Sequence, residues 1–345
     1  MSSVEVSKDR YRAAVLGAGS WGTALAIHLG TLGHDVALWG RDAALLDAMA
    51  ERRANPTYLP DVTFPALLRP TSSMTTALTG ARHVVVAVPS HGLRAVLRKA
   101  APALPRDAIL VSATKGIESD SLKRMSEVLH DETEGRHPVV VLSGPSFAAE
   151  VARRLPTALV AASSDDVALR AVQEEFRGPL FRLYGSKDVI GVEISASMKN
   201  IIAIAAGIVE ALGLGHNAMA ALITRGLAEI SRLSSAMGGE RETASGLSGL
   251  GDLVLTCTGS LSRNRQVGLE LGRGRSLEEI LSGMRMVAEG VRTTPAALEL
   301  GRQYGVELPI AAMIGEVLAG RKAPREAVSN LMLRPQRVEQ ETGSA

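Results

Sequence analysis

The chain has 345 residues, of which 21% are charged, and a formal net charge of +2. This length predicts two domains with sizeable buried cores, and so small a net charge excludes the strong basic field of most nucleic-acid-binding proteins. The one cysteine, Cys257, excludes an intramolecular disulfide, and without a Cys/His cluster we expect no metal site.

We expect neither a targeting segment nor a membrane span. Residues 1–8 are polar and lack the apolar core of a signal peptide. The longest apolar stretch, residues 190–214, carries Glu193, Lys199 and Glu210, so it should form a buried helix rather than cross a membrane. These features predict a cytoplasmic protein.

The first predicted unit, residues 13–39, is a strand, a glycine turn, a helix and a second strand. Its turn has the pattern Gly-x-Gly-x-x-Gly. Gly17 permits a sharp turn, Gly19 lets the backbone approach a pyrophosphate, and Gly22 lets the helix pack on the strand. The free N–H groups of the helix would face the anion, so this unit predicts dinucleotide binding.

The end of the second strand bears on the choice of cofactor. A protein built for NAD usually places Asp or Glu there, to accept a hydrogen bond from the ribose 2′-OH. This chain reads Trp39-Gly40-Arg41, and its first carboxylate comes only at Asp42. An arginine pairs with a 2′-phosphate through two hydrogen bonds, so we expect NADP(H) to be preferred and NAD(H) to be accepted. The alternative is that Arg41 is a solvated surface charge.

Strands and helices continue to alternate through the first half, as they do in a parallel sheet with helices on both faces. The expected helices span residues 43–53, 74–78 and 93–104. The expected strands span residues 67–70, 84–88, 109–113, 139–142, 158–162 and 180–184. Together with the first unit they predict an α/β fold with a Rossmann-type doubly wound parallel sheet.

Three of these strands end in small or charged residues. The segments that follow them are Pro89-Ser90, Lys115-Gly116 and Gly144-Pro145-Ser146. Because open α/β sheets bind ligands at the carboxyl ends of their strands, these residues should share one crevice. Lys115 could reach an anionic substrate or a carbonyl there, and the alternative is a solvated loop lysine.

After residue 188 the predicted strands stop. Helical periodicity marks residues 192–212, 218–237, 263–271, 276–282, 294–304 and 309–318. We expect a Rossmann domain over residues 1–188, an all-α domain over residues 189–333 and a disordered polar tail over residues 334–345. The apolar helices of the second domain would permit a homodimer.

Lys199 is the strongest candidate for catalysis. Its helical neighbours three and four residues away are small or apolar, so its ammonium should be buried. Burial lowers the pKa of an ammonium, which makes a lysine a general acid or base near neutral pH. Asn200 points about 100° around the helix and could reach the same substrate. The alternative is a lysine at a helix edge that extends its ammonium into water.

Two further segments add charge to the helical half. Three glycines shortly before Asp252 indicate a tight turn, and its carboxylate would keep Lys199 charged and oriented. The alternative for Asp252 is a helix N-cap. Ser262-Arg263-Asn264 opens a predicted helix, where a guanidinium beside unpaired N–H groups makes a phosphate site.

The combined motifs resemble one known family. They are GAGSWGTALA at the first turn, Thr114-Lys115-Gly116, SGPSFAAEV, Glu193 with Lys199-Asn200, ITRGLAE, GLSGLGDLVLTC and Ser262-Arg263-Asn264. In this order they look like the bacterial type of NAD(P)-dependent glycerol-3-phosphate dehydrogenase, from about residue 12 to residue 331. The resemblance implies a Rossmann domain and an all-α domain like the C-terminal domain of 6-phosphogluconate dehydrogenases, with the active site between them.

The resemblance also implies roles for individual residues. Lys199 would exchange the proton when dihydroxyacetone phosphate and sn-glycerol 3-phosphate are interconverted, and the second compound would feed phospholipid synthesis. With the residues identified above, the expected substrate contacts are Lys115, Gly144, Ser146, Lys199, Asn200, Asp252, Ser262, Arg263 and Asn264. The expected nucleotide contacts are Gly17, Gly19, Ser20, Trp21, Gly22, Arg41, Tyr58, Lys115, Ala148, Arg263, Val287 and Glu289.

Two other functions stay open. A related reductase of the β-hydroxyacid or ketopantoate type would act on a carboxylate and would need no phosphate site. A catalytically silent NADPH sensor would bind the nucleotide without turnover. The presence of both Lys115 and Lys199 argues against this function. Activity on dihydroxyacetone phosphate separates these cases.

Overall fold

Eight strands form one sheet in the first half of the chain, which the computed structural model describes over residues 10–284 and 288–336. The order across the sheet is β3-β2-β1-β4-β5-β6-β7-β8. The strands are β1 (Arg12–Leu16), β2 (Asp35–Trp39), β3 (Leu68–Thr71), β4 (His83–Val86), β5 (Ile109–Ser112), β6 (Val139–Ser143), β7 (Thr157–Ala162) and β8 (Phe181–Ser186). The predicted Rossmann-type fold is confirmed.

The sheet departs from the parallel arrangement at one edge. Strands β1 to β6 run parallel, whereas β7 is antiparallel to β6, and β8 is parallel to β7. The link from β6 to β7 contains only α6 (Ala148–Ala152), a helix of five residues. The chain turns back at the carboxyl edge after this short helix, so β7 runs antiparallel to β6.

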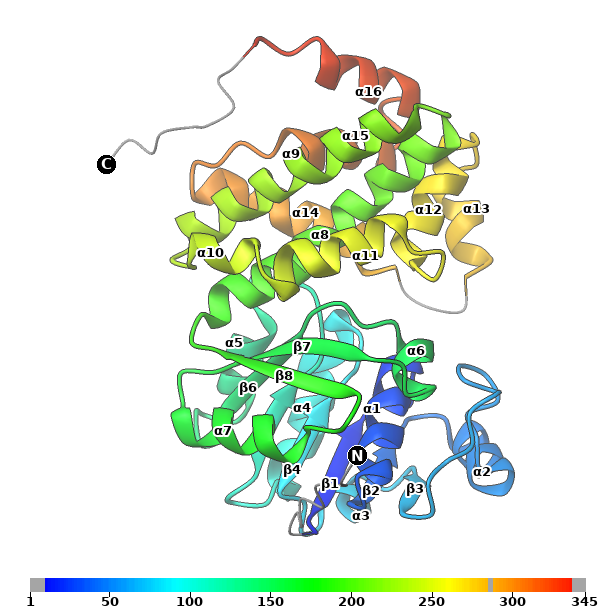
Figure 1. Cartoon of the computed structure of the whole chain (residues 1–345), viewed down its shortest axis with the longest axis vertical. Helices are drawn as coiled ribbons and strands as arrows, with labels where there is room; N and C mark the ends of the chain where they lie inside the picture. The colour runs from blue at the N-terminus through cyan, green and yellow to red at the C-terminus, as the bar shows by residue number, and fades with distance from the viewer. Residues whose placement is uncertain (1–9, 285–287, 337–345) are drawn as a thin grey trace, which may run out of the picture.

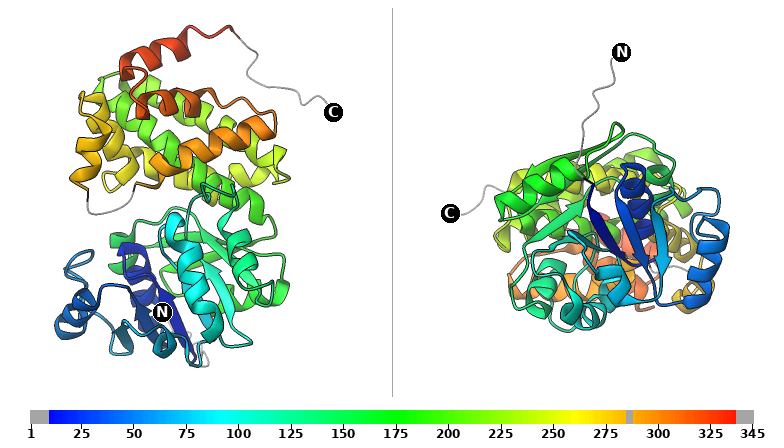
Figure 2. Two further views of the ribbon diagram at one scale, coloured as in Figure 1. Left: turned by 180° about the vertical axis from the view of Figure 1, so that it is seen from behind. Right: turned by 90° about the horizontal axis from the view of Figure 1, so that it is seen from below.

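Helices cover both faces of the sheet (Figures 1 and 2). One face packs against α1 (Ser20–Thr31) and α7 (Asp166–Glu175). The other face packs against α3 (Met74–Leu78), α4 (Leu93–Ala100) and α5 (Met125–Glu132). The remaining elements of this half are α2 (Ala43–Arg52), which packs beside β3, and the 3-10 turns η1 (Ser90–Gly92) and η2 (Ala101–Ala103).

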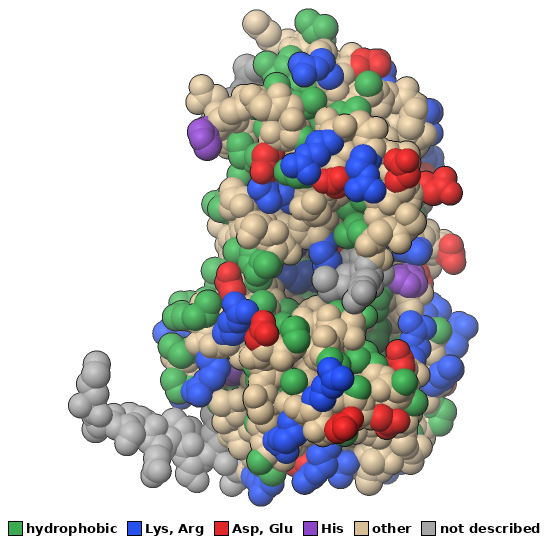
Figure 3. Space-filling model, turned by 90° about the vertical axis from the view of Figure 1, so that its right-hand side faces the viewer, with side chains coloured by type: hydrophobic (Ala, Val, Ile, Leu, Met, Phe, Trp, Pro, Cys, Tyr) green, Lys and Arg blue, Asp and Glu red, His purple; other side chains and the backbone are tan. Residues whose placement is uncertain are grey.

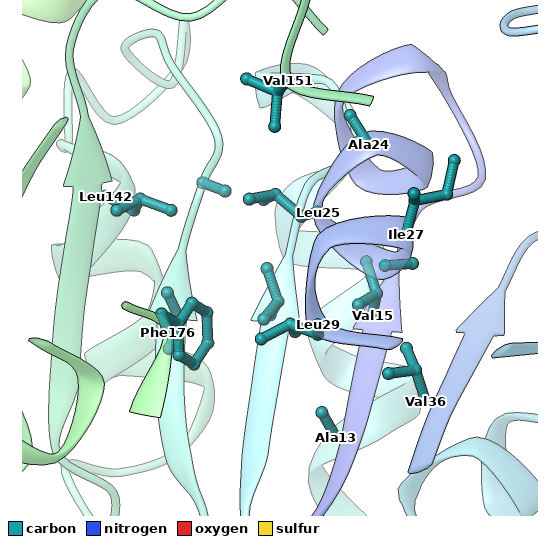
Figure 4. Packing of buried hydrophobic residues seen from close by; sticks show 14 of the residues in the cluster. Ala13, Val15, Ala24, Leu25, Ile27, Leu29, Val36, Leu142, Val151 and Phe176 are labelled. Carbon is teal, nitrogen blue, oxygen red and sulfur yellow. The ribbon is translucent and has the colours of Figure 1, made fainter. Parts of the chain in front are cut away.

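Strand β1 shows why both faces are covered. Ala13 and Val15 join the core on the α1 side, where Figure 4 shows them in the same cluster as Leu25 and Leu29 of α1. Ala14 and Leu16 belong to the core on the opposite face. Successive strand residues point to opposite faces, so a strand that is apolar at every position must be buried on both sides.

The second half of the described chain is helical and stacks on one end of the sheet half (Figure 1). It comprises α8 (Val189–Ala211), α9 (Gly215–Ala236), α10 (Arg241–Ala244), the π-helical turn η3 (Leu247–Gly251), α11 (Asp252–Thr258), α12 (Arg263–Gly272), α13 (Leu277–Ser282), α14 (Glu289–Gln303), α15 (Pro309–Leu318) and α16 (Pro324–Met332). Of the predicted tail, only residues 334–336 are described, and Arg334 pairs there with Glu307 at 3.1 Å.

Helix α8 connects the two halves. By length and composition it could cross a membrane, but 89% of its apolar window is buried inside the protein, as predicted for a core helix. Its first turn packs on the sheet, because Val192 clusters with Val141 and Ala162. The helix thus contacts both halves, and we keep the division of the chain into two domains near Asp188 as a proposal.

Candidate active site

Lys199 of α8 and Asp252 of α11 form a buried ion pair. The Lys199 Nζ donates to Asp252 Oδ1 at 2.6 Å and to the hydroxyl of Thr256 at 2.8 Å. Lys199 is 6% exposed and Asp252 is 1% exposed. The ammonium therefore does not extend into water, and the Asp252 side chain does not cap a helix.

Lys115 reaches the same carboxylate from the sheet half. It follows β5, and its Nζ donates to Asp252 Oδ2 at 2.7 Å and to the carbonyl of Gly144 at 3.2 Å. The hydroxyl of Ser146 donates to that same carbonyl at 3.0 Å. The loops after β5 and β6 are thus joined to the start of α11, as expected if both strand ends face one crevice.

The three charged groups perturb one another. Burial lowers the pKa of Lys199 to about 8, although the negative charge of Asp252 opposes the shift. Burial alone would raise the pKa of Asp252, but the charges of Lys115 and Lys199 outweigh it and hold that pKa below its usual value. A lysine that titrates near neutral pH can exchange a proton with a substrate. Cys257 lies nearby, but burial raises its pKa to about 12, which makes it a poor nucleophile.

Glu193 holds α8 against the sheet half. Its carboxylate accepts hydrogen bonds from Arg124 Nη1 at 2.7 Å and from the backbone N–H of Ser126 at 2.8 Å. Both partners lie at the start of α5. A small recess between α8 and the ends of β5 and β6 is lined by Glu193, Ser197 and Lys115 among others. These hydrogen bonds fix the rotation of α8 and its position along its axis. They thereby place Lys199, which lies about 1.7 turns further along the helix.

The start of α12 lies beside these groups. Ser262 caps the helix, since its Oγ accepts from the backbone N–H of Arg265 at 3.2 Å. Asn264 Nδ2 donates to Asn200 Oδ1 at 2.9 Å. Arg263 is the first residue of α12, and partial desolvation of its guanidinium by the surrounding chain lowers its pKa. The amides of Asn200 and Asn264 are therefore adjacent, and a guanidinium lies at a helix start.

The glycine turn is tightly packed at two glycines and open at the third. Gly17 has φ +123°, and a Cβ there would lie 2.5 Å from the carbonyl oxygen of Ala87. A Cβ at Gly22 would lie 1.9 Å from the carbonyl oxygen of Gly17. At Gly19 a Cβ would meet no atom of the described chain within 4 Å. The space beside Gly19 is where a pyrophosphate would approach the first turn of α1, so the turn fits a dinucleotide.

Two side chains next to the turn support this fit. Ser20 is the first residue of α1. The indole N–H of Trp21 is buried and has no hydrogen-bond partner among residues 10–284 and 288–336. Buried donors are normally satisfied, so a bound group is expected to supply the missing acceptor.

Arg41 lies exposed just after β2. The carboxylate that follows it is engaged elsewhere, because Asp42 caps α2 by accepting from the backbone N–H of Leu45 at 3.1 Å. No acidic side chain therefore stands at the position that reads a ribose 2′-OH in NAD-specific sheets.

The remaining expected nucleotide residues surround this region. Ala148 is the first residue of α6, which packs against α1. Tyr58 and Glu289 both act electrostatically on Arg263, so these three groups lie near one another. Val287 lies outside the described residues. On the face that Figure 3 shows, Lys and Arg side chains lie at the waist between the two halves.

Several supporting residues were not found from the sequence. Asn55 is buried and donates to the carbonyl of Ala18 at 3.0 Å while its Oδ1 accepts from the backbone N–H of Tyr58, so it fastens the Tyr58 loop to the glycine turn. The hydroxyl of Thr256 accepts a hydrogen bond from Lys199. Thr256 lies one helical turn after Asp252, and this spacing could have identified it from the sequence as a second partner of Lys199.

Arg265 is another supporting residue that the sequence did not reveal. Its side chain is only 16% exposed and pairs with Glu210 of α8. This pair packs α12 on α8, where the backbones are close: a Cβ at Gly207 would lie 2.0 Å from the carbonyl oxygen of Arg265. Arg265 therefore supports the packing of the helix that carries Arg263 and Asn264.

The sequence matches family models over most of its length. The matching models describe the N-terminus of NAD-dependent glycerol-3-phosphate dehydrogenase over residues 12–169 and its C-terminus over residues 188–329. A glycerol-3-phosphate dehydrogenase (NAD(P)+) from Koribacter versatilis is 53% identical over 274 residues, which are 79% of this chain and 81% of the relative. One from Thioalkalivibrio sulfidiphilus is 54% identical over 269 residues, 78% of this chain and 81% of the relative.

Solved structures give the same result. The crystal structure of a glycerol-3-phosphate dehydrogenase from Coxiella burnetii is 40% identical, with a TM-score of 0.91 over 94% of this chain and 99% of that chain. A ketopantoate reductase from Ralstonia eutropha is 14% identical, with a TM-score of 0.59 over 92% of this chain and 99% of that chain. The second likeness shows a common fold alone.

Proposed function

This chain belongs to the NAD-dependent glycerol-3-phosphate dehydrogenase family, and we infer from this that it interconverts dihydroxyacetone phosphate and sn-glycerol 3-phosphate with NADP(H) or NAD(H). The product of the reduction supplies phospholipid synthesis. The observation that carries the inference is the cluster of the buried Lys199–Asp252 pair with Lys115, which joins the helical half to the carboxyl ends of β5 and β6. The ketopantoate-type alternative is not favoured, because that relative shares the fold alone.

Lys199 is the proposed general acid and base. When bound, the nicotinamide supplies a hydride to C2 of the substrate. Negative charge develops on the C2 oxygen in that step, and Lys199 gives it a proton. Asp252 fixes the ammonium by a hydrogen bond and favours its charged form, while Lys115 and Asn200 supply further donors to the same oxygen. In the reverse direction the neutral amine takes the proton from the hydroxyl.

The start of α12 is the proposed phosphate site. Arg263 offers a guanidinium at a helix start, and Ser262 and Asn264 add polar groups beside it. Gly144 and Ser146 approach from the loop after β6. A phosphate held there places C2 near Lys199 and adds binding energy away from the reacting carbon, which lowers the barrier by positioning.

The glycine turn is the proposed pyrophosphate site. Gly17 and Gly22 bring strand and helix together, and Gly19 leaves the space for the anion. We propose that Arg41 pairs with the 2′-phosphate of NADP(H). The other proposed nucleotide contacts are Ser20, Trp21, Tyr58, Lys115, Ala148, Arg263 and Glu289. Val287 is part of the same proposal on the resemblance alone.

A cytoplasmic location and a homodimer are further proposals. The single cysteine suits a reducing compartment, and Cys257 is buried. Sedimentation of the purified protein over a range of concentrations tests the dimer, because a monomer at every concentration contradicts it.

Oxidation of NADPH in the presence of dihydroxyacetone phosphate tests the function. The wild type should turn over, and Lys199→Ala should lose at least 100-fold in kcat while it still binds NADPH, since general acid catalysis contributes about 10²- to 10⁴-fold. Lys123→Ala is a matched control, because that lysine forms a surface pair with Asp131. Wild-type turnover in Lys199→Ala would contradict the general-acid role, and an inactive wild type that binds NADPH would favour the silent sensor.

A further inference from the structure

One backbone group defines how the amides of Asn200 and Asn264 are oriented. The N–H of Gly290, in the first turn of α14, donates to Asn264 Oδ1 at 2.9 Å. A backbone N–H can only donate, so the atom of Asn264 that it contacts must be the oxygen. Asn264 Nδ2 then donates to Asn200, which must present its own oxygen at 2.9 Å. The NH2 group of Asn200 is therefore turned away from Asn264.

That NH2 group is little used within the protein. Its hydrogen bond to the carbonyl of Ala196 is 3.5 Å long, the limit for such a bond. Within residues 10–284 and 288–336 it makes no other hydrogen bond. Asn200 is 5% exposed and Asn264 is 8% exposed, so little water competes for the group. A fixed N–H donor is thus available next to Lys199.

Gly290 is pressed against the two asparagines. A Cβ at this position would lie 2.6 Å from the carbonyl oxygen of Asn200 and 2.9 Å from Asn264 Oδ1. The hydroxyl of Thr294 donates to the Gly290 carbonyl at 2.7 Å and closes the first turn of α14. Only glycine permits so close an approach, so the N–H that orients the amides is held by three helices at once.

The residue before Gly290 ties the same turn to the sheet. The carboxylate of Glu289 accepts from the hydroxyl of Ser90 at 2.6 Å and from its backbone N–H at 3.2 Å. Ser90 follows β4 and lies close to Gly116, which follows β5. A Cβ at Gly116 would lie 2.8 Å from the Cβ of Ser90. The first turn of α14 therefore contacts the carboxyl edge of the sheet through Glu289 and the pair of asparagines through Gly290.

We propose that Asn264 is a positioning residue, which fixes the Asn200 amide so that its NH2 group donates to the C2 oxygen of the substrate. The proposal rests on the proposed reduction of dihydroxyacetone phosphate, because the oxygen that gains charge at C2 needs a donor already in place. A direct contact of Asn264 with the phosphate would have a different effect. It would use the second hydrogen of Nδ2, and its loss would raise KM rather than lower kcat.

A double-mutant cycle on kcat separates the two roles. Asn264→Asp keeps an acceptor for the Gly290 N–H but removes the donor to Asn200, whose amide can then reverse. With saturating NADPH and dihydroxyacetone phosphate, we expect kcat to fall roughly 10- to 100-fold, as for the loss of one donor to a developing oxyanion. In the background of Asn200→Ala, which removes the donor itself, Asn264→Asp should cause no further fall in kcat.

A second variant and an isotope effect distinguish a slower hydride step from a loss of folded protein. Asn264→Ala should show the same coupling, and Gln266→Ala, an exposed position on the same helix, should leave kcat unchanged. With NADPH deuterated at the transferred position, the isotope effect on kcat should rise in Asn264→Asp because the hydride step slows. NADPH affinity and the thermal midpoint report whether each variant is folded.

The outcomes are distinct. Independent losses in kcat from Asn200→Ala and Asn264→Asp that multiply in the double variant would overturn the positioning role. So would an increase in KM at unchanged kcat, which indicates a phosphate contact only. A wild type that does not reduce dihydroxyacetone phosphate would instead refute the proposed function, before any variant is measured.

Discussion

Lys199 Nζ lies 2.6 Å from Asp252 Oδ1, although 53 residues separate the two in the sequence. Both side chains are almost fully buried, so neither charge is screened by water. Removing one partner of such a pair leaves an uncompensated charge, whereas the intact pair keeps both groups ionised. The pair therefore sets the protonation of the proposed catalytic lysine.

The pH dependence of the reduction should report the Lys199 ammonium. Its pKa is about 8 in the free protein, so the proton donor is present below that pH and is lost above it. We expect kcat/KM for dihydroxyacetone phosphate to fall tenfold per pH unit above about pH 8, because this parameter follows the free enzyme. The oxidation of sn-glycerol 3-phosphate should show the opposite dependence and increase up to about pH 8.

Asp252→Asn should move this pH profile to lower pH. The amide cannot offset the effect of burial, and Lys115 adds a repelling charge, so the pKa of Lys199 should fall. We expect kcat/KM to decline from below pH 7 and to be at least tenfold reduced at pH 7.5. Asp131→Asn, which breaks surface pairs with Lys123 and Arg94, is the control. An unchanged profile would show that Asp252 does not govern Lys199.

Local patterns predicted most of the fold and part of the site. The glycine turn and the apolar runs depend on neighbours in sequence, and so does the apolar surrounding of Lys199. The reversed direction of β7 depends on how it pairs with β6, and the contact of Ser90 with Glu289 joins residues 199 positions apart. Such contacts arise only when the chain is folded, so periodicity carries no sign of them. Helix α7 was also missed, although its cap, Asp165, accepts from two backbone N–H groups.

Arg41→Ala should weaken the use of NADPH without affecting the use of NADH. A guanidinium that pairs with a 2′-phosphate contributes to the binding of NADPH but not of NADH, which has a hydroxyl there. We expect KM for NADPH to increase at least tenfold and KM for NADH to change less than twofold. Arg52→Ala, at an exposed position in the following helix, should affect neither. Equal losses with both nucleotides would refute the role of Arg41.

Glu229 should make the stability of the helical half depend on pH. It is buried, and its carboxylate accepts from the backbone N–H groups of Ile310 and Ala311 at the start of α15. Burial raises its pKa to about 7 from the usual 4.5, so the folded chain keeps this proton up to a higher pH than the unfolded chain. The folded state therefore loses stability as pH rises from about 4.5 to 7, by on the order of 3 kcal/mol.

Unfolding in urea at pH 5 and pH 8 tests this linkage. Glu229→Gln removes the titration, so the free energy of unfolding of the wild type relative to the variant should fall between the two pH values. Glu326→Gln, at an exposed position of α16, should give a difference from the wild type that is nearly the same at both. If the free energy of unfolding of Glu229→Gln differs from that of the wild type by the same amount at pH 5 and pH 8, the Glu229 carboxylate does not titrate between these values.

Two alanine substitutions should separate the packing role of the glycine turn from its binding role. Gly19 has φ −78°, which any residue adopts, and a Cβ there meets no atom of the described chain, so Gly19→Ala should fold like the wild type. The added methyl group would occupy the space proposed for the pyrophosphate, and we expect the dissociation constant for NADPH to rise at least tenfold.

At Gly22 a Cβ would lie 1.9 Å from the carbonyl oxygen of Gly17, so Gly22→Ala must shift α1 and should lower the free energy of unfolding by about 1–3 kcal/mol. Thermal unfolding and NADPH fluorescence measure both effects. If Gly19→Ala bound NADPH as the wild type does, the pyrophosphate would have to lie elsewhere.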